Sequence, residues 1–160
     1  MYKRQRLDWP NDVVVGGAKL SGVLVESRGL EPERPHYVLG IGLNVRQGGF
    51  PPELAAERAV TSLLQLGVEA TVDAAAGEVL RALAPRLEQV RRDPDGLCAE
   101  FAGATGCLGR AVRVRAGARS GEGRLSGLSL AGGLVIEEPG GASRRFALEH
   151  VTALEPLPGP

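Results

Sequence analysis

The chain has 160 residues and no net formal charge at pH 7, because 19 basic side chains balance 19 acidic ones. A neutral chain has no overall field that attracts nucleic acid or an anionic membrane surface, so neither partner is expected. No apolar run approaches the roughly 20 residues that a membrane-spanning helix needs. The length suits one domain or two small ones, with enough chain to bury a core.

The first residues and the cysteines bear on the origin of the chain. MYKRQ, residues 1–5, is polar, resembles the translation of a sequencing adapter and is interpreted as a non-native leader; a ragged natural terminus is the alternative. Cys98 and Cys107 are the only cysteines and form no C-x-x-C motif. We therefore expect reduced, partly buried thiols in a cytoplasmic protein, and no metal site built from cysteine.

A β-hairpin is predicted directly after the Trp-Pro-Asn-Asp motif, with a β-branched strand at 13–15 and a return strand at 18–26. The two glycines between these strands suit the two-residue loop of a type I′ or II′ turn. Asn11 and Asp12 stand at the strand entrance, where their side chains can bond local backbone or a ligand.

Lys19 is a cation in an otherwise nearly apolar hairpin. The two-residue loop places Lys19 opposite Val14 and Asp12 opposite Ser21, so Asp12 and Lys19 are expected about one diagonal apart. A lysine held in mid-sheet by packed neighbours has little rotamer freedom left to lose when it binds an anion. The alternative is an edge-strand lysine that only blocks aggregation.

The strand predicted at 36–45, HYVLGIGLNV, presents two different faces. One face is apolar and is expected to point towards a core: Leu39, Ile41, Leu43 and Val45. The other has few side chains to fill space: Val38, Gly40, Gly42 and Asn44. Glycines inside a strand often mark the close approach of a ligand, although a bulge or tight packing against a helix is the alternative. Next to the lysine strand, this face predicts the floor of a narrow pocket with polar groups at one end.

Taken in order, WPND, a glycine turn, K-L-x-G-x-L-V-E and G-I-G-L-N-V resemble the biotin–protein ligases. The A-V-T-S-L segment at 59–63 fits the stretch that follows in that family. The resemblance covers nearly everything from Arg6 onward. It implies that residues 6–105 are the second half of the catalytic domain, that 106–157 form an SH3-like C-terminal domain, and that the N-terminal half is missing.

The resemblance also implies a role for each site residue. Lys19 matches the catalytic lysine that contacts the carboxylate of biotin and the reacting α-phosphate. Gly22 and Leu24 match walls of the biotin pocket, and Gly40 matches a backbone contact to biotin. The positions that match ATP-binding residues are Asn11, Asp12, Asn44, Phe50 and Val60. The last two lie in a segment, 47–63, expected to fold over the adenylate.

Two features depart from the family pattern. Asp8 stands where the family usually has a lysine before the tryptophan, and an anion beside a triphosphate is electrostatically unfavourable. The Gly-Arg-Gly-Arg-type loop that clamps biotin and the adenylate does not occur in this sequence. We therefore expect this chain alone to be inactive as an enzyme.

The implied reaction uses biotin, ATP and Mg²⁺. The biotin carboxylate attacks the α-phosphorus of ATP, and the biotinyl-5′-AMP formed then passes its biotinyl group to a lysine of a biotin carboxyl carrier protein or carboxylase carrier domain. Two anions meet in the first step, so fixed positive charge from Lys19 is required. Mg²⁺ is expected on the phosphates and at most one or two carboxylates. Family members often dimerise through their sheets, so a homodimer is a further expectation.

The rest of the chain predicts an α+β fold. Helices are expected at 61–67 behind a Thr61 cap, at 71–92 with a kink or break at Pro85, and at 97–104. Five short alternating runs predict a small antiparallel barrel at 111–115, 123–130, 133–137, 144–148 and 151–154. The resemblance makes this a partial mixed or antiparallel sheet with covering helices, as in class II synthetase-like ligase cores, followed by an SH3-like barrel.

Arginines are frequent in the predicted barrel: Arg110, Arg113, Arg115, Arg119, Arg124, Arg144 and Arg145. They either face an acidic carrier protein or form a solvated strand face, and the sequence leaves both open. His36 and His150 are expected to be structural, because the implied reaction needs no nucleophilic side chain.

Two classes of function follow from the sequence. The first is a biotin–protein ligase, present here as a partial chain. The second is a non-catalytic fragment or pseudo-ligase that binds carrier proteins. The repressor form of the family needs an N-terminal helix-turn-helix; this sequence shows none, and it does not decide whether one exists upstream. A lipoate-ligase interpretation fits less well, because the WPND and GIGLNV pair looks specific to the biotin branch.

Overall fold

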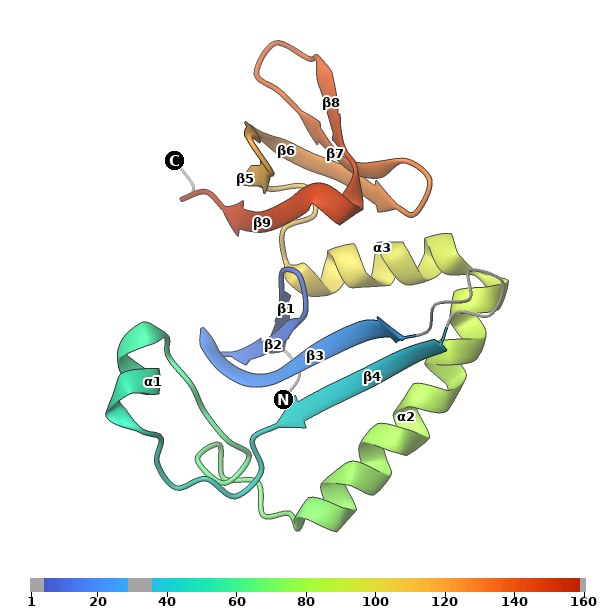
Figure 1. Ribbon diagram of the computed structural model, residues 1–160. Helices are drawn as coiled ribbons and strands as arrows, with labels where there is room; N and C mark the ends of the chain where they lie inside the picture. Colours follow the sequence, from blue (N-terminus) through green and yellow to red (C-terminus); the bar gives the residue numbers. More distant parts are fainter. Residues whose placement is uncertain (1–4, 29–35, 159–160) are drawn as a thin grey trace. The chain divides into compact units, whose positions relative to one another are not determined.

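The computed structural model describes residues 5–28 and 36–158 (Figure 1). By its internal contacts the chain divides into two units, the first formed mainly by Asn11–Ala76 and the second by Arg6–Pro10 and Gly77–Pro160. This division falls well before the boundary predicted at 105–106. Of the predicted leader, only Gln5 lies among the described residues, at the start of β1 (Gln5–Asp8).

The first unit contains three consecutive antiparallel strands of a four-stranded sheet with the order β1-β2-β3-β4. These are β2 (Asp12–Val15), β3 (Ala18–Arg28) and β4 (His36–Leu43), with β3 in the middle. The loop between β2 and β3 is the predicted glycine pair, and both glycines have positive φ, +61° and +87°. Such angles are favourable only for glycine, which explains why the two-residue turn requires both.

The register between β2 and β3 contains a bulge that the sequence did not predict. Val14 pairs with Lys19 as expected, but Asp12 pairs with Gly22 and not with Ser21, because the register shifts between Val13 and Val14. The extra residue in β3 changes which side chains share a face. Without it Lys19 and Gly22 would point to opposite faces; with it, they lie on the face that also carries Asp12.

The apolar face of β4 is not buried as predicted. Leu39 and Ile41 each keep 38% of their surface exposed, whereas Val45, just after the strand, is buried. The expected core at β4 is therefore wrong for Leu39 and Ile41, whereas Leu43 is half-buried and Val45 is buried.

The segment after β4 has little regular structure. It contains one short helix, α1 (Pro52–Glu57), inside the segment predicted to fold over a ligand. The helix predicted at 61–67 is wrong: these residues form turns. Ser62 takes the role assigned to Thr61, because its hydroxyl accepts from the Gln65 N–H at 3.2 Å and donates to the Gln47 carbonyl at 2.6 Å.

Two longer helices follow. α2 (Val72–Arg92) begins after Thr71, whose hydroxyl accepts from the Ala74 N–H, and it continues through Pro85 as one helix, so the predicted break does not occur. α3 (Pro94–Thr105) begins with Asp93 as its cap, because the carboxylate accepts from the Gly96 N–H at 2.9 Å. No helix among the described residues is long and apolar enough to cross a membrane.

The second unit contains a five-stranded antiparallel sheet in the order β8-β7-β6-β5-β9. Its strands match the predicted runs closely: β5 (Ala111–Ala116), β6 (Arg119–Ser129), β7 (Gly133–Glu137), β8 (Ser143–Phe146) and β9 (Val151–Pro156). A single-turn 3₁₀ helix, Leu148–His150, precedes β9. No pairing joins β8 to β9 among the described residues, so a closed barrel is not found and the SH3-like class stays a prediction.

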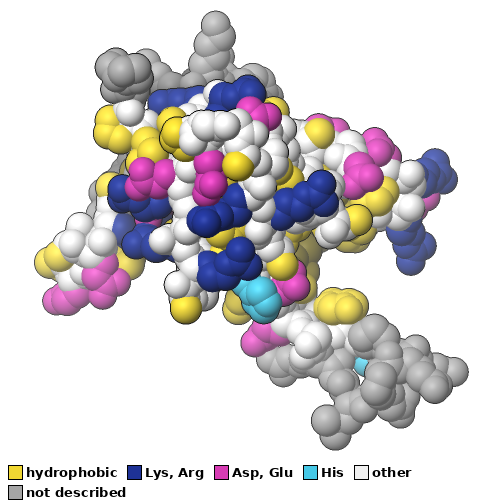
Figure 2. All heavy atoms as spheres, turned by 90° about the horizontal axis from the view of Figure 1, so that it is seen from above, with side chains coloured by type: hydrophobic (Ala, Val, Ile, Leu, Met, Phe, Trp, Pro, Cys, Tyr) yellow, Lys and Arg dark blue, Asp and Glu magenta, His cyan; other side chains and the backbone are white. Residues whose placement is uncertain are grey.

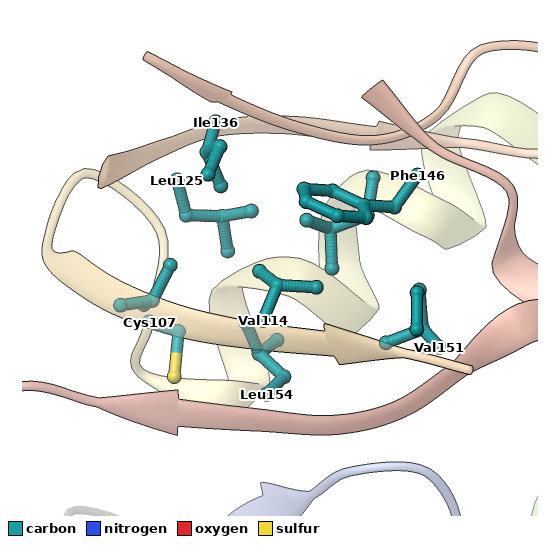
Figure 3. Packing of buried hydrophobic residues seen from close by; sticks show 10 residues of the cluster. Cys107, Val114, Leu125, Ile136, Phe146, Val151 and Leu154 are labelled. Atoms are coloured by element: carbon teal, nitrogen blue, oxygen red, sulfur yellow. The ribbon is translucent and has the colours of Figure 1, made fainter. Parts of the chain in front are cut away.

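The main hydrophobic core lies inside this sheet (Figure 3). Its members are Cys107, Val112, Val114, Ala116, Leu125, Leu134, Ile136, Phe146, Val151 and Leu154. Trp9, which belongs to the second unit, packs against this core and donates its indole N–H to the Val151 carbonyl at 2.8 Å. Both cysteines are buried free thiols, as predicted, and burial raises the pKa of Cys98.

The arginines of the sheet are largely paired within their own unit. Arg113 meets Glu122 at 2.7 Å, and Arg144 meets Glu138 at 3.1 Å. Two further pairs are Arg115 with Glu155 and Arg124 with Glu137. On the face shown in Figure 2, basic and acidic side chains are likewise intermixed. This pairing favours the solvated strand face over a surface for an acidic carrier.

Candidate functional site

A cavity of about 640 Å³ lies on β2, β3 and β4 in the first unit. Its lining contains most of the predicted site residues: Asn11, Asp12, Lys19, Gly22, Leu24, Gly40 and Asn44. Lys19 and the glycines of β4 therefore share one cavity, as the pocket hypothesis requires. Phe50 and Val60 do not line it.

Lys19 is fixed at both its backbone and its side chain. Its N–H donates to the Ala59 carbonyl at 2.9 Å, and its carbonyl accepts from the Thr61 N–H at 2.8 Å. These bonds form a short parallel bridge between Lys19 and Val60. The Lys19 ammonium lies 2.6 Å from Asp12 Oδ1. A lysine held this way has already lost most of its rotamer freedom before a ligand arrives.

Asp12 is the anion at the centre of the site, with 11% of its side chain exposed. Its second oxygen, Oδ2, accepts a hydrogen bond from the Arg58 guanidinium at 2.5 Å. Burial by itself would raise the pKa of Asp12, but hydrogen bonds and Coulomb attraction from Lys19 and Arg58 outweigh it, and the pKa is lowered. Asp12 is therefore a carboxylate at neutral pH.

Because Gly22 has no side chain, the Asp12–Lys19 ion pair can occupy the space next to it. A Cβ at position 22 would lie 2.9 Å from Asp12 Oδ1 and 3.0 Å from Lys19 Nζ, closer than real Cβ atoms approach such groups. Gly40 differs, because a Cβ there would meet only the Leu24 carbonyl at 3.7 Å, an ordinary contact. A side chain at position 22 would therefore displace Asp12 or Lys19, whereas Gly40 leaves the cavity floor open.

The side chains of the two asparagines donate hydrogen bonds to backbone carbonyls. Asn11 donates its side-chain N–H to the Val23 carbonyl at 2.6 Å, and Asn44 donates to the Thr61 carbonyl at 2.9 Å. Asn44 thus ties the cavity floor to the segment that runs beside Lys19. Val60 contributes through its backbone bridge, and Phe50 is half-buried away from the cavity.

Comparison with known proteins finds a family and relatives that match this chain. A family profile described as the biotin/lipoate A/B protein ligase family matches residues 2–44. A biotin–[acetyl-CoA-carboxylase] ligase of Mycobacterium tuberculosis is 40% identical over 109 residues, 68% of this chain and 38% of that protein. One from Paracoccus denitrificans is 29% identical over 143 residues, 86% of this chain and 59% of that protein.

Solved structures of a biotin protein ligase are also similar to this chain. The biotin protein ligase from Aquifex aeolicus in complex with biotin and ATP has a TM-score of 0.73 and 26% identity, covering 96% of this chain and 62% of that one. The apo structure of the same enzyme has a TM-score of 0.72. The chain belongs to the biotin protein ligase family. It spans between 38% and 66% of the length of these relatives.

One residue beside this cavity was missed by the sequence interpretation. Arg58 follows α1 inside the predicted covering segment, and its guanidinium reaches Asp12 across 46 positions of sequence. No periodic pattern marks it. The available signal was a lone cation just before A-V-T-S-L, in a segment expected to fold over an anionic intermediate.

The protein side chains do not fit a resident Mg²⁺ ion. Both oxygens of Asp12 face cations, Lys19 and Arg58. In the part of the chain that the structure describes, no group of three or more His, Cys, Asp or Glu side chains could hold a metal ion. The described side chains therefore form no protein cage for a divalent cation, whereas Mg²⁺ commonly binds through one or two carboxylates, water and substrate phosphates.

Proposed function

We propose that this chain is the part of a biotin–protein ligase that supplies the catalytic lysine and one wall of the biotin and ATP site. The full reaction joins biotin to a lysine of a biotin carrier protein, such as that of acetyl-CoA carboxylase, at the cost of ATP. The observation that supports the proposal is the shared cavity: Lys19 faces the same hollow as Gly22, Gly40 and Asn44.

In the first step a carboxylate oxygen of biotin attacks the α-phosphorus of ATP. The bond from that phosphorus to the pyrophosphate leaving group breaks, and biotinyl-5′-AMP forms. Lys19 supplies positive charge where the two anions meet, which is worth most in a site that excludes water. Its fixed backbone, bonded on both sides to Ala59 and Thr61, keeps the ammonium in place.

In the second step the amine of a carrier lysine attacks the carbonyl carbon of the mixed anhydride. The bond to AMP breaks, an amide forms, and the amine loses its proton. The main contribution of the protein in this step is to position the two reactants, so the chain needs no nucleophile of its own. Neither His36 nor His150 lines the cavity, in keeping with this assignment.

The experiment joins this chain to the upstream segment of the Mycobacterium tuberculosis relative, which this chain does not cover. A cooperative unfolding transition establishes that the fusion folds. We expect biotin-dependent exchange of label between pyrophosphate and ATP, and transfer of biotin to a carrier domain. Lys19→Ala should lower the exchange rate by about 100-fold, whereas Arg91→Ala, on the exposed end of α2, should not.

The second candidate is a pseudo-ligase that binds carrier proteins without catalysis. In that case the folded fusion should bind biotinyl-5′-AMP but show no exchange. The isolated chain is proposed to be inactive by itself. Exchange activity of the 160-residue chain without the upstream segment would contradict that.

A further inference from the structure

One carboxylate in the cavity is shared by two cations from distant parts of the chain. Asp12 Oδ1 lies 2.6 Å from Lys19 Nζ, and Asp12 Oδ2 lies 2.5 Å from the Arg58 guanidinium. Asp12 is nearly buried, while Lys19 and Arg58 keep 32% and 37% of their side chains exposed. Lys19, which lines the cavity, is therefore accessible to a ligand, whereas Asp12 is held between the two cations.

The formal charges of these three side chains decide what an incoming anion meets. Lys19 and Asp12 alone form a neutral pair, which attracts a carboxylate or phosphate only weakly. With Arg58 the three groups sum to one positive charge. Since Arg58 takes one oxygen of Asp12, less of the carboxylate charge is directed at Lys19, and the ammonium keeps more of its attraction for a ligand.

The backbone holds Arg58 at this place from both sides. Its own N–H bonds to the Leu54 carbonyl at 3.3 Å, which closes the end of α1. The next residue, Ala59, accepts the bond from the Lys19 N–H. Arg58 is thus attached directly to the segment that pairs with Lys19, and the guanidinium has a short path to Asp12.

We propose that Arg58 is a positioning residue that keeps the cavity net positive, so that Lys19 can bind the carboxylate or phosphate of an anionic ligand. This rests on the proposed function for the identity of the ligand, but it concerns the charge of the site and can be tested without catalysis. The competing account is that Arg58 only ties its segment to the sheet.

The test uses inorganic pyrophosphate as the probe and the full 160-residue chain. Binding is followed by the amide chemical shifts of Lys19, Gly22 and Asn44 in NMR spectra. We expect Arg58→Gln to weaken pyrophosphate binding by about tenfold, and Arg58→Lys, which keeps the charge, to weaken it by less than about threefold. Arg91→Gln removes an equal charge from the exposed end of α2 and should leave binding unchanged.

A second variant separates charge from structure. In the Arg58→Gln background, Asp12→Asn removes the negative charge and returns the cluster to one net positive charge, so pyrophosphate binding should recover by several-fold. A purely structural role predicts no recovery, because a second contact has then been lost. The recovered binding should also weaken as salt is added, since it depends on charge.

Two outcomes would overturn the proposal. One is that Arg58→Gln binds pyrophosphate as tightly as the unchanged chain. The other is that the unchanged chain shows no shifts at these three amides, because the cavity then does not attract anions. Failure of the proposed function is seen separately, as a folded fusion without Lys19-dependent exchange, and leaves these pyrophosphate results unaffected.

Discussion

In the second unit Leu125, Leu134 and Ile136 are fully buried, whereas in the first unit Leu24 and Tyr37 keep 60% and 68% of their surface exposed. The second unit thus stabilises itself with an apolar core. The first unit carries the candidate site on a sheet whose apolar side chains are largely exposed in the described residues. Its local geometry depends instead on a bulge, a glycine and a charge cluster. Stability and site chemistry are therefore expected to respond to different substitutions.

The largest expected contrast is between core and sheet leucines. Leu125→Ala should lower the free energy of unfolding by about 3 kcal/mol, because it removes buried methyl groups and leaves a cavity. Leu24→Ala, at an exposed position, should change it by less than about 0.5 kcal/mol. Urea unfolding followed by the fluorescence of Trp9, the only tryptophan, reports on the second unit, and hydrogen exchange of the Asn44 amide reports on the first.

Equal effects of these two substitutions would contradict the comparison. Such a result would mean that the β3–β4 sheet is buried in solution. A measurement at several protein concentrations then distinguishes burial by a second copy from burial within the chain, because only association depends on concentration.

The next contrast lies within the cavity, between two glycines. Gly22→Ala should cost about 1 kcal/mol, because its methyl group would meet Asp12 and Lys19. Gly40→Ala has room and should be neutral or stabilising by up to about 0.5 kcal/mol, since alanine is less flexible in the unfolded chain. Hydrogen exchange of the Asn44 amide, which bonds to the Leu20 carbonyl at 3.0 Å, reports on this region.

A measurement of ligand binding further distinguishes the roles of Gly22 and Gly40. Gly40→Ala should impair binding of biotinyl-5′-AMP by the fused enzyme without loss of stability, because the methyl group enters the cavity floor. Gly22→Ala could instead leave both the hydrogen-exchange protection of the Asn44 amide and the binding of biotinyl-5′-AMP unchanged. In that case Asp12 and Lys19 do not pack closely against Gly22.

Local patterns were sufficient to predict the strands. The glycine pair at 16 and 17 specified its turn, and alternation located the strands of the second unit to within a few residues, because both signals depend on neighbours in sequence. The lysine and the glycine face were correctly placed in one cavity. The Val14–Lys19 pairing also followed from the loop length alone.

Features set by tertiary contacts could not be predicted in the same way. The bulge that pairs Asp12 with Gly22 adds one residue to β3, and nothing in the local sequence requires it. Arg58 reaches Asp12 only because the backbone after α1 returns to pair with Lys19. The residues at 61–67 have helical propensity, but their backbone bonds instead to Lys19, Asn44 and Val45. Alternation in β4 indicated an apolar face but not what covers it.

The smallest expected effect concerns the pH dependence of the charge cluster. The pKa of Asp12 is lowered in the folded chain, because Lys19 and Arg58 together outweigh the opposing effect of burial. Its contribution to stability is therefore complete above the ordinary pKa of aspartate, 3.8, and is lost as the pH falls through the lower folded value. Because both cations are about a third exposed, the contribution should not exceed about 1 kcal/mol.

Asp12→Asn removes this titration. The protection of the Asn44 amide in the unchanged chain should exceed that in the variant at pH 5, and the difference should shrink as the pH is lowered to about 2. Glu69→Gln, at an exposed position of the first unit, serves as the matched control and should leave the pH dependence as it is. A difference that grows towards acid would mean that the pKa of Asp12 is raised, and that burial outweighs the two cations. The same result would remove the charge asymmetry on which the role of Arg58 depends, since a protonated Asp12 would no longer share its charge between Lys19 and Arg58.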